Sequence, residues 1–105
     1  MKNFNSVLYR DTGQKLIAAV QRHSAFLAQS ELAAVEHYLN SDEYEMAYEL
    51  FCLQLMRHNV RLEPQDCSAL ITLGSTLGLD QETVFEPDFW RSFQSYVNKQ
   101  GIQLE

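Results

Sequence analysis

The 105-residue sequence is poor in several features that mark particular classes of protein. No apolar run approaches the roughly 20 residues that cross a bilayer, so a membrane-spanning protein is not expected. Only four glycines and two prolines are present, which leaves little material for the turns of an all-β fold. The first residues, 1–6, lack the apolar core of a secretory signal. We therefore expect a cytoplasmic protein that does not act on a membrane.

Basic residues and cysteines are also scarce. The eight lysines and arginines are scattered along the chain, whereas nucleic-acid-binding proteins cluster such residues against phosphates. Direct binding of nucleic acid or of an anionic membrane surface is therefore not expected. The two cysteines, Cys52 and Cys67, each lie within an apolar helical pattern. That setting is typical of reduced, buried thiols rather than of a structural disulfide.

No motif for catalysis or cofactor binding is apparent. The histidines His23, His37 and His58 fall in different predicted helices or connectors, and none belongs to an HExxH or CxxC set. No glycine-rich phosphate loop is present, and neither cysteine has a base beside it in the sequence. An enzyme would require His37 or His58 to meet Glu or Cys side chains in a cleft. The sequence therefore predicts a protein that is not an enzyme and has no metal or cofactor.

The positive signals are helical. Hydrophobic residues make up 46% of the chain and recur at helical spacing, which predicts one domain over residues 1–105. The predicted fold is all-α, a compact single-domain bundle of about five helices. The helices are expected to begin at Asp11 or Thr12, Ser30, Asp42, Pro64 and Pro87.

Three further details of this fold are predicted. The third helix, about 42–57, is apolar nearly all round in its second half and should lie in the middle of the bundle. Gly74 and Gly78 should either allow close helix approach or end the fourth helix, and Gly101 could cap the last one. Residues 80–86 should form a loop. The segments 7–9 and 84–85 could be short extended pieces.

The net charge of −6 comes from one stretch, residues 31–49, which contains no lysine or arginine. Its acids are Glu31, Glu36, Asp42, Glu43, Glu45 and Glu49. By spacing, Asp42, Glu45 and Glu49 fall on one ridge of the third helix. Such segregated charge suggests a field presented to a basic macromolecule. Helix capping and solubility offer a second explanation, which accounts well for Asp42 and Glu43 at a helix start but poorly for the missing bases.

Tyrosines lie among these acids. Tyr38 and Tyr44 flank a predicted helix–helix junction, and tyrosine commonly anchors interfaces. The remaining large aromatic side chains are interpreted as core. The candidate partner-binding residues are therefore Glu36, Tyr38, Asp42, Glu43, Tyr44, Glu45 and Glu49.

The segment from Glu31 to Leu50 resembles the MafI-type immunity proteins of bacterial polymorphic and contact-dependent toxin systems. The resemblance is carried by Glu43-Tyr44, Ala47 and Glu49-Leu50, and by Leu-Gly-Leu-Asp at residues 77–80. It implies a small, all-helical cytoplasmic protein that binds a cognate toxin domain and blocks it, and many such toxins are nucleases. The implied partner is the basic C-terminal domain of a toxin, bound 1:1. A helical adaptor or secretion chaperone for a basic client remains the alternative function.

Overall fold

Helices account for all regular structure in residues 6–100, the part of the chain that the computed structural model describes. They are α1 (Ser6–Arg22), the 3-10 turn η2 (Ser24–Phe26), α2 (Gln29–Asn40), α3 (Tyr44–Arg57), α4 (Pro64–Thr76) and α5 (Phe89–Asn98). No strand occurs among the described residues, so the predicted all-α class is confirmed. The prediction of short extended pieces at 7–9 and 84–85 is wrong: the first lies in α1 and the second in a bend.

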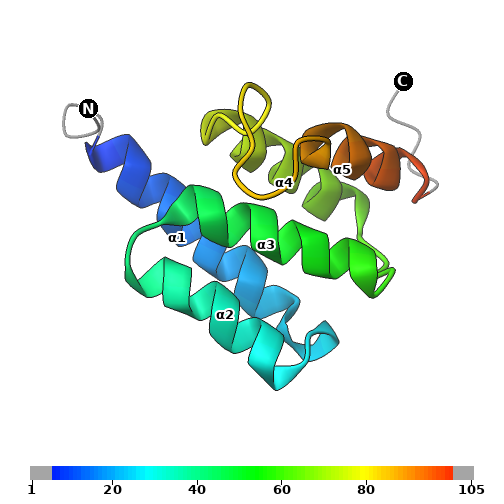
Figure 1. Cartoon of the computed structure of the whole chain (residues 1–105), viewed down its shortest axis with the longest axis horizontal. Coiled ribbons are helices and arrows are strands. Elements are labelled where there is room, and N and C mark those ends of the chain that lie inside the picture. The colour runs from blue at the N-terminus through cyan, green and yellow to red at the C-terminus, as the bar shows by residue number, and fades with distance from the viewer. Residues whose placement is uncertain (1–5, 101–105) are drawn as a thin grey trace.

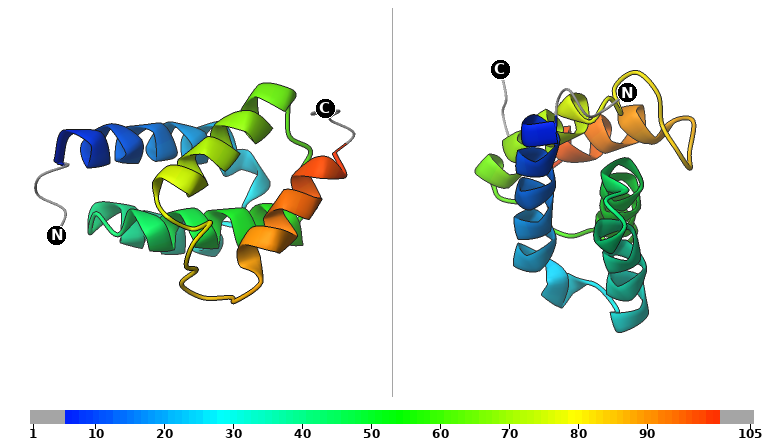
Figure 2. Two further views of the ribbon diagram at one scale, coloured as in Figure 1. Left: turned by 90° about the horizontal axis from the view of Figure 1, so that it is seen from above. Right: turned by 90° about the vertical axis from the view of Figure 1, so that its left-hand side faces the viewer.

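The helix α3 lies at the centre of the bundle. It contacts α1, α2, α4 and α5, with α2 beside it and with α4 and α5 covering one side of the α1–α3 unit (Figures 1 and 2). Its side chains Tyr48, Phe51 and Leu55 have no exposed surface. The ring of Tyr48 packs edge-on against Phe89 and Phe93 of α5, which are also fully buried. The prediction of a central hydrophobic helix is therefore confirmed.

The first helix begins earlier than its capping residues suggested. It starts at Ser6, and Thr12 is buried within it, so the predicted start at Asp11 or Thr12 is wrong. A tertiary contact explains the extension. The ring of Tyr9 packs on Tyr44 at a centroid distance of 4.7 Å, and its hydroxyl donates to the backbone oxygen of Asp42 at 2.9 Å. These contacts stabilise the additional N-terminal residues of α1, and local capping rules take no account of such tertiary contacts.

The turn between α2 and α3 also differs from the prediction. Asp42 adopts a left-handed backbone conformation with φ of 58°, so α3 begins at Tyr44 rather than at Asp42. The helix α2 begins one residue before Ser30, and α5 begins at Phe89, two residues after Pro87. The predicted start of α4 at Pro64 is confirmed. Gly101 lies outside the described residues.

Gly74 lies within α4 and Gly78 follows it, and each takes one of the two roles that the sequence left open. A Cβ atom added to Gly74 would lie 2.4 Å from a ring carbon of Trp90 and 2.5 Å from the Tyr48 hydroxyl oxygen, so Gly74 permits close helix approach. Gly78 has a φ of +88° and follows the helix, where its backbone amide bonds the carbonyl of Ser75. It therefore ends the helix in the conformation that glycine adopts most easily.

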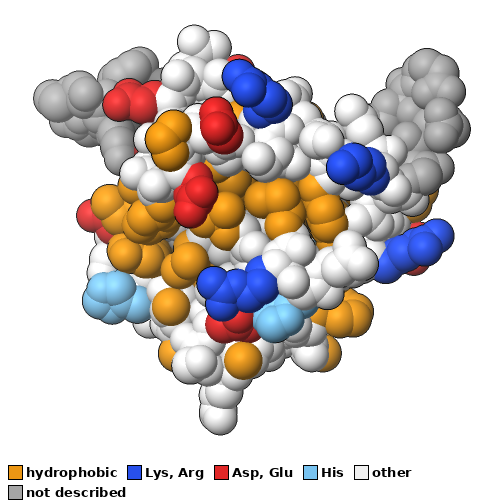
Figure 3. Space-filling view, turned by 45° about the vertical axis from the view of Figure 1, so that its right-hand side comes forward, with side chains coloured by type: hydrophobic (Ala, Val, Ile, Leu, Met, Phe, Trp, Pro, Cys, Tyr) orange, Lys and Arg blue, Asp and Glu red, His pale blue; other side chains and the backbone are white. Residues whose placement is uncertain are grey.

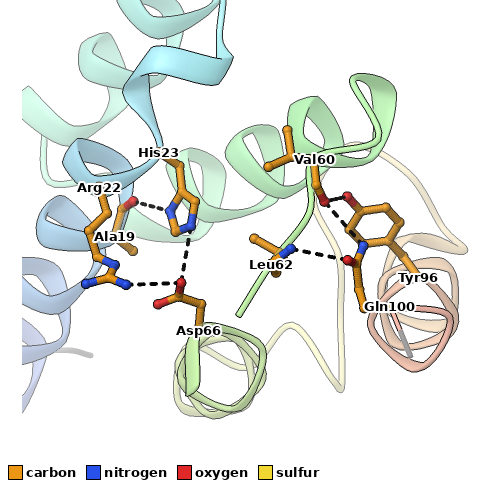
Figure 4. A network of polar contacts seen from close by, with 8 residues as sticks. All are labelled: Ala19, Arg22, His23, Val60, Leu62, Asp66, Tyr96 and Gln100. Atoms are coloured by element: carbon orange, nitrogen blue, oxygen red, sulfur yellow. Dashed lines mark hydrogen bonds and ion pairs between the residues drawn. The ribbon is translucent and has the colours of Figure 1, made fainter. Parts of the chain in front are cut away.

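Two polar networks join the helices at their ends (Figure 4). Nδ1 of the buried His23 lies 2.8 Å from the carbonyl oxygen of Ala19, to which it must donate, and Nε2 faces a carboxylate oxygen of Asp66 at 3.5 Å. Arg22 reaches the same oxygen at 3.2 Å. The network ties the end of α1 to the start of α4, so His23 has a structural role here.

The second network holds the connector between α3 and α4. The Tyr96 hydroxyl and the Gln100 amide both donate to the carbonyl of Val60, and the Gln100 oxygen accepts from the amide of Leu62 at 3.2 Å (Figure 4). Val60 and Leu62 are buried as well. The connector is therefore packed against the C-terminal end of α5 although it contains no regular structure.

Both cysteines are buried and free, as predicted. Burial raises the pKa of the Cys52 thiol well above its ordinary value and raises that of Cys67 too. These thiols are therefore poor nucleophiles at neutral pH. Among the described residues, no helix has the length and apolar character needed to cross a membrane.

Candidate partner-binding surface

Glu49 does not lie on an exposed acidic ridge, and that prediction is wrong. Its side chain is fully buried on α3. One carboxylate oxygen accepts a hydrogen bond from the amide of Val84 at 2.6 Å, and the other accepts from Phe85 at 2.9 Å and Glu86 at 2.8 Å. Three successive backbone amides thus replace the water that a buried carboxylate loses. Glu49 is a structural clamp on the loop between α4 and α5.

The clamped segment carries two of the three large hydrophobic side chains that are exposed in residues 9–100. Val84 is 42% exposed and Phe85 is 43% exposed, and the third is Phe26, at 52%. Val84 and Phe85 are adjacent in the chain, and we call this pair the tip. The buried carboxylate of Glu49 fixes the backbone of the tip, while the side chains of Val84 and Phe85 remain in contact with solvent.

The two candidate tyrosines have different environments. Tyr38 is half-buried, and the centroid of its ring lies 6.0 Å from the centroid of the Phe85 ring. Tyr38 therefore lies beside the tip. Tyr44 is only 8% exposed and covers Gly13, and its hydroxyl donates to the Asp42 carboxylate at 3.1 Å. Burial, and then the Asp42 carboxylate, raise the pKa of Tyr44. Tyr44 is a core residue, so its prediction as an exposed anchor is wrong, whereas Tyr38 remains a candidate.

A groove of about 520 Å³ separates the start of α3 from the α4–α5 loop. Three carboxylates line it: Glu43 and Glu45 from α3 and its N-terminal flank, and Glu82 from the loop. Its apolar wall includes Met46 and Val84. The groove shows that acids from two segments far apart in the sequence meet on one side of the molecule.

The second acidic segment was not singled out by sequence reasoning. Residues 80–88 contain four acids, Asp80, Glu82, Glu86 and Asp88, and no lysine or arginine. Between Arg22 and Arg91 the only lysines or arginines are Arg57 and Arg61. The compositional signal was therefore present, but only the fold places this loop beside the start of α3.

Three of the predicted acids, Asp42, Glu45 and Glu36, differ in their exposure and in their contacts. Asp42 is exposed in the turn before α3, where its carboxylate accepts from Tyr44. Glu45 is partly buried and accepts from the Tyr9 hydroxyl at 3.2 Å. Glu36 is exposed on α2. Figure 3 shows a band of hydrophobic side chains with several acidic side chains around its left part, while lysine and arginine side chains lie above, below and to the right of the band.

Glu31 belongs to a different cluster. Its carboxylate accepts from the amide of Ala28 at 2.8 Å, lies 2.8 Å from Nε2 of His58 and lies 3.6 Å from Arg57. The Ala28 amide, and then His58, lower the pKa of Glu31. Glu31 therefore joins the start of α2 to the end of α3 and is not part of the surface around the tip.

We predict that Glu31→Gln lowers the stability of the protein in a pH-dependent way. Because folding lowers the pKa of Glu31, the carboxylate stabilises the fold above its unfolded pKa near 4.5. That contribution is lost as the pH falls through the lower, folded pKa. Urea unfolding of both proteins at neutral pH should show a difference that shrinks at about pH 3.5. Equal differences at both pH values would contradict this role.

We define the candidate partner-binding surface by the tip, the Tyr38 ring beside it, the acids that line the groove and the acid that follows the tip. Its members are Tyr38, Glu43, Glu45, Glu82, Val84, Phe85 and Glu86.

Among the described residues, no group of three or more His, Cys, Asp or Glu side chains is arranged to hold a metal ion. The absence of an enzymatic role stays a prediction. Comparisons of the chain with protein-family models, curated proteins and solved structures found no match.

Proposed function

We propose that this chain is an immunity protein that binds a cationic toxin domain 1:1 and blocks it, as its sequence resemblance implies. The observation that supports the proposal is the meeting of two acidic segments, around Glu43 and around Glu82, at one groove. An exposed aromatic side chain, Phe85, lies in the same loop as Glu82. The surface thus combines charge with an apolar contact.

The acidic surface favours a nuclease as the toxin, and among nucleases we expect a ribonuclease. A nuclease holds phosphates and so presents a basic active site or substrate channel. An acidic face can approach that region with complementary charge, which accelerates association and discriminates against other partners. Single exposed ion pairs add only about 0.2–1 kcal/mol each, so lasting inhibition also requires buried contacts. Covering the active site and binding beside it both satisfy this requirement.

Co-expression tests the function directly. The C-terminal domain of the protein encoded immediately upstream is produced in cells with and without this chain. We expect growth arrest without it, and rescue together with a co-purifying complex when it is present. A complex with a harmless basic client would instead support the adaptor or secretion-chaperone alternative. If the domain is not toxic and forms no complex with this chain, the immunity proposal is overturned.

We predict that Glu43→Lys combined with Glu82→Lys slows association with that domain about tenfold or more at low salt. Both side chains are exposed at the groove, and reversing them removes attraction and adds repulsion. Stopped-flow or surface-based kinetics at two salt concentrations provide the measurement.

The matched control is Asp11→Lys combined with Glu63→Lys, which changes the net charge equally. Asp11 lines the groove between α1 and α4, and Glu63 precedes α4. Its association rate should fall much less than that of the groove variant. Equal slowing by the two double variants would mean that net charge alone, rather than this surface, governs association.

A further inference from the structure

The apolar side chains of the tip remain in contact with solvent instead of joining the core. Val84 and Phe85 expose large apolar side chains side by side, in a loop that also exposes the acids Glu82, Glu86 and Asp88. Isolated exposed hydrophobic residues are common and need no explanation. Here, however, the exposed pair sits on the three-residue backbone segment that the buried carboxylate of Glu49 holds.

Holding the tip in this way has a thermodynamic cost. A fully buried carboxylate loses its hydration, and its three hydrogen bonds compensate for that loss. The same hydrogen bonds order a loop whose side chains face water. A loop that is already ordered loses less conformational entropy when a partner binds it. The arrangement is therefore that of a preorganised contact, with Phe85 supported on one side by the ring of Tyr38.

The charges around the tip indicate what it meets. Glu82 and Glu86 flank it in the chain, and Glu43 lies across the groove that Val84 lines. A docking surface complementary to this arrangement is apolar in the middle and rimmed by lysine or arginine. The groove itself can receive one such side chain, with its aliphatic stem against Met46 and its cationic end at the carboxylates.

We propose that the tip is the apolar anchor of the complex and enters an apolar depression bordered by lysine or arginine on the cationic toxin domain. This inference rests on the proposed function, because that domain is its partner. It assigns to Phe85 and Val84 the main share of the lifetime of the complex, and to the surrounding acids mainly the rate of its formation.

The test uses the full chain and the purified, inactivated C-terminal domain of the upstream-encoded protein as the probe. The affinities of wild type, Phe85→Ala, Val84→Ala and Phe26→Ala are measured by calorimetry at low and high salt. Phe26 is the matched control, because it is as exposed as Phe85 but lies on η2. Circular dichroism and thermal unfolding confirm that each variant is folded.

We expect Phe85→Ala to weaken binding about 30-fold or more, the loss that corresponds to an interface hot spot. The loss should be similar at both salt concentrations, because apolar contact is not screened. Phe26→Ala should change the affinity less than about twofold. The groove variant Glu43→Lys with Glu82→Lys should lose most affinity at low salt.

Two results would overturn the inference in distinguishable ways. Near-wild-type affinity of Phe85→Ala and Val84→Ala, together with weak binding by the groove variant, would remove the anchor role but leave the proposed function standing. No binding by wild type at either salt concentration would remove the proposed function and the anchor with it.

Discussion

Replacing Glu49 with alanine is expected to lower the free energy of unfolding by about 3–5 kcal/mol, a large share of the stability of a domain this small. The substitution removes three charge-assisted hydrogen bonds to the amides of Val84, Phe85 and Glu86. It also leaves a cavity at a fully buried position of α3. Urea unfolding followed by circular dichroism measures the loss.

An isosteric variant and a surface control sharpen this prediction. Glu49→Gln keeps the volume but offers one acceptor oxygen in place of two, so its loss should be smaller than that of Glu49→Ala. Glu36→Ala removes an exposed acid from α2 and should change the stability by less than about 0.5 kcal/mol. Hydrogen exchange of the amides at 84–86 should accelerate in both Glu49 variants. If those amides stay protected in Glu49→Ala, the clamp does not hold the loop.

Glu49 also illustrates what local sequence patterns can predict. Helical spacing correctly places Glu49 one turn after Glu45 on α3, although Asp42 lies in the turn before the helix, and spacing does not reveal what covers Glu49. The covering segment begins at Val84, 35 residues further along the chain. A carboxylate next to hydrophobic residues on a helix is most often solvated, so the expectation followed a sound rule. In the folded protein, the three amides at 84–86 bind the carboxylate instead of water, so Glu49 is buried.

Elements defined by local chemistry were predicted well. Pro64 marks the start of α4 because its fixed φ and missing amide suit the first turn of a helix. The buried face of α3 follows from hydrophobic spacing alone, as Tyr48 and Phe51 show. The start of α1 did not follow, because the contact between Tyr9 and Tyr44 joins residues on different helices.

The candidate surface was predicted only in part for the same reason. The acids before and within α3 were visible as a charge-segregated stretch, and Glu43 does line the groove. The loop acids were equally visible in the sequence, but nothing local indicates that Glu82 faces Glu43 or that Phe85 meets Tyr38. A surface built from two distant segments becomes evident only when the fold brings them together.

Replacing Gly74 with alanine is expected to destabilise the protein by about 2–4 kcal/mol, although alanine favours helix more than glycine does by about 1 kcal/mol. The new Cβ atom would lie 2.4 Å from Trp90 and 2.5 Å from the Tyr48 hydroxyl oxygen, so either α4 or these two aromatic rings must move. The same movement strains the hydrogen bond from Tyr48 to the carbonyl of Leu70, which is 2.6 Å long and buried.

The comparison that isolates this clash is Ser68→Ala, an exposed change on the same helix, which should leave the stability unchanged or slightly higher. Tyr48→Phe removes the hydroxyl oxygen that the Cβ atom would strike. The stability loss of the double variant with Gly74→Ala should therefore be smaller than the sum of the losses of the two single variants. A neutral or stabilising Gly74→Ala would show that α4 does not pack this closely on Tyr48 and Trp90. Because the α4–α5 loop leaves α4 just beyond Gly74, the same variant should also weaken partner binding, through displacement of the tip rather than through any contact of its own.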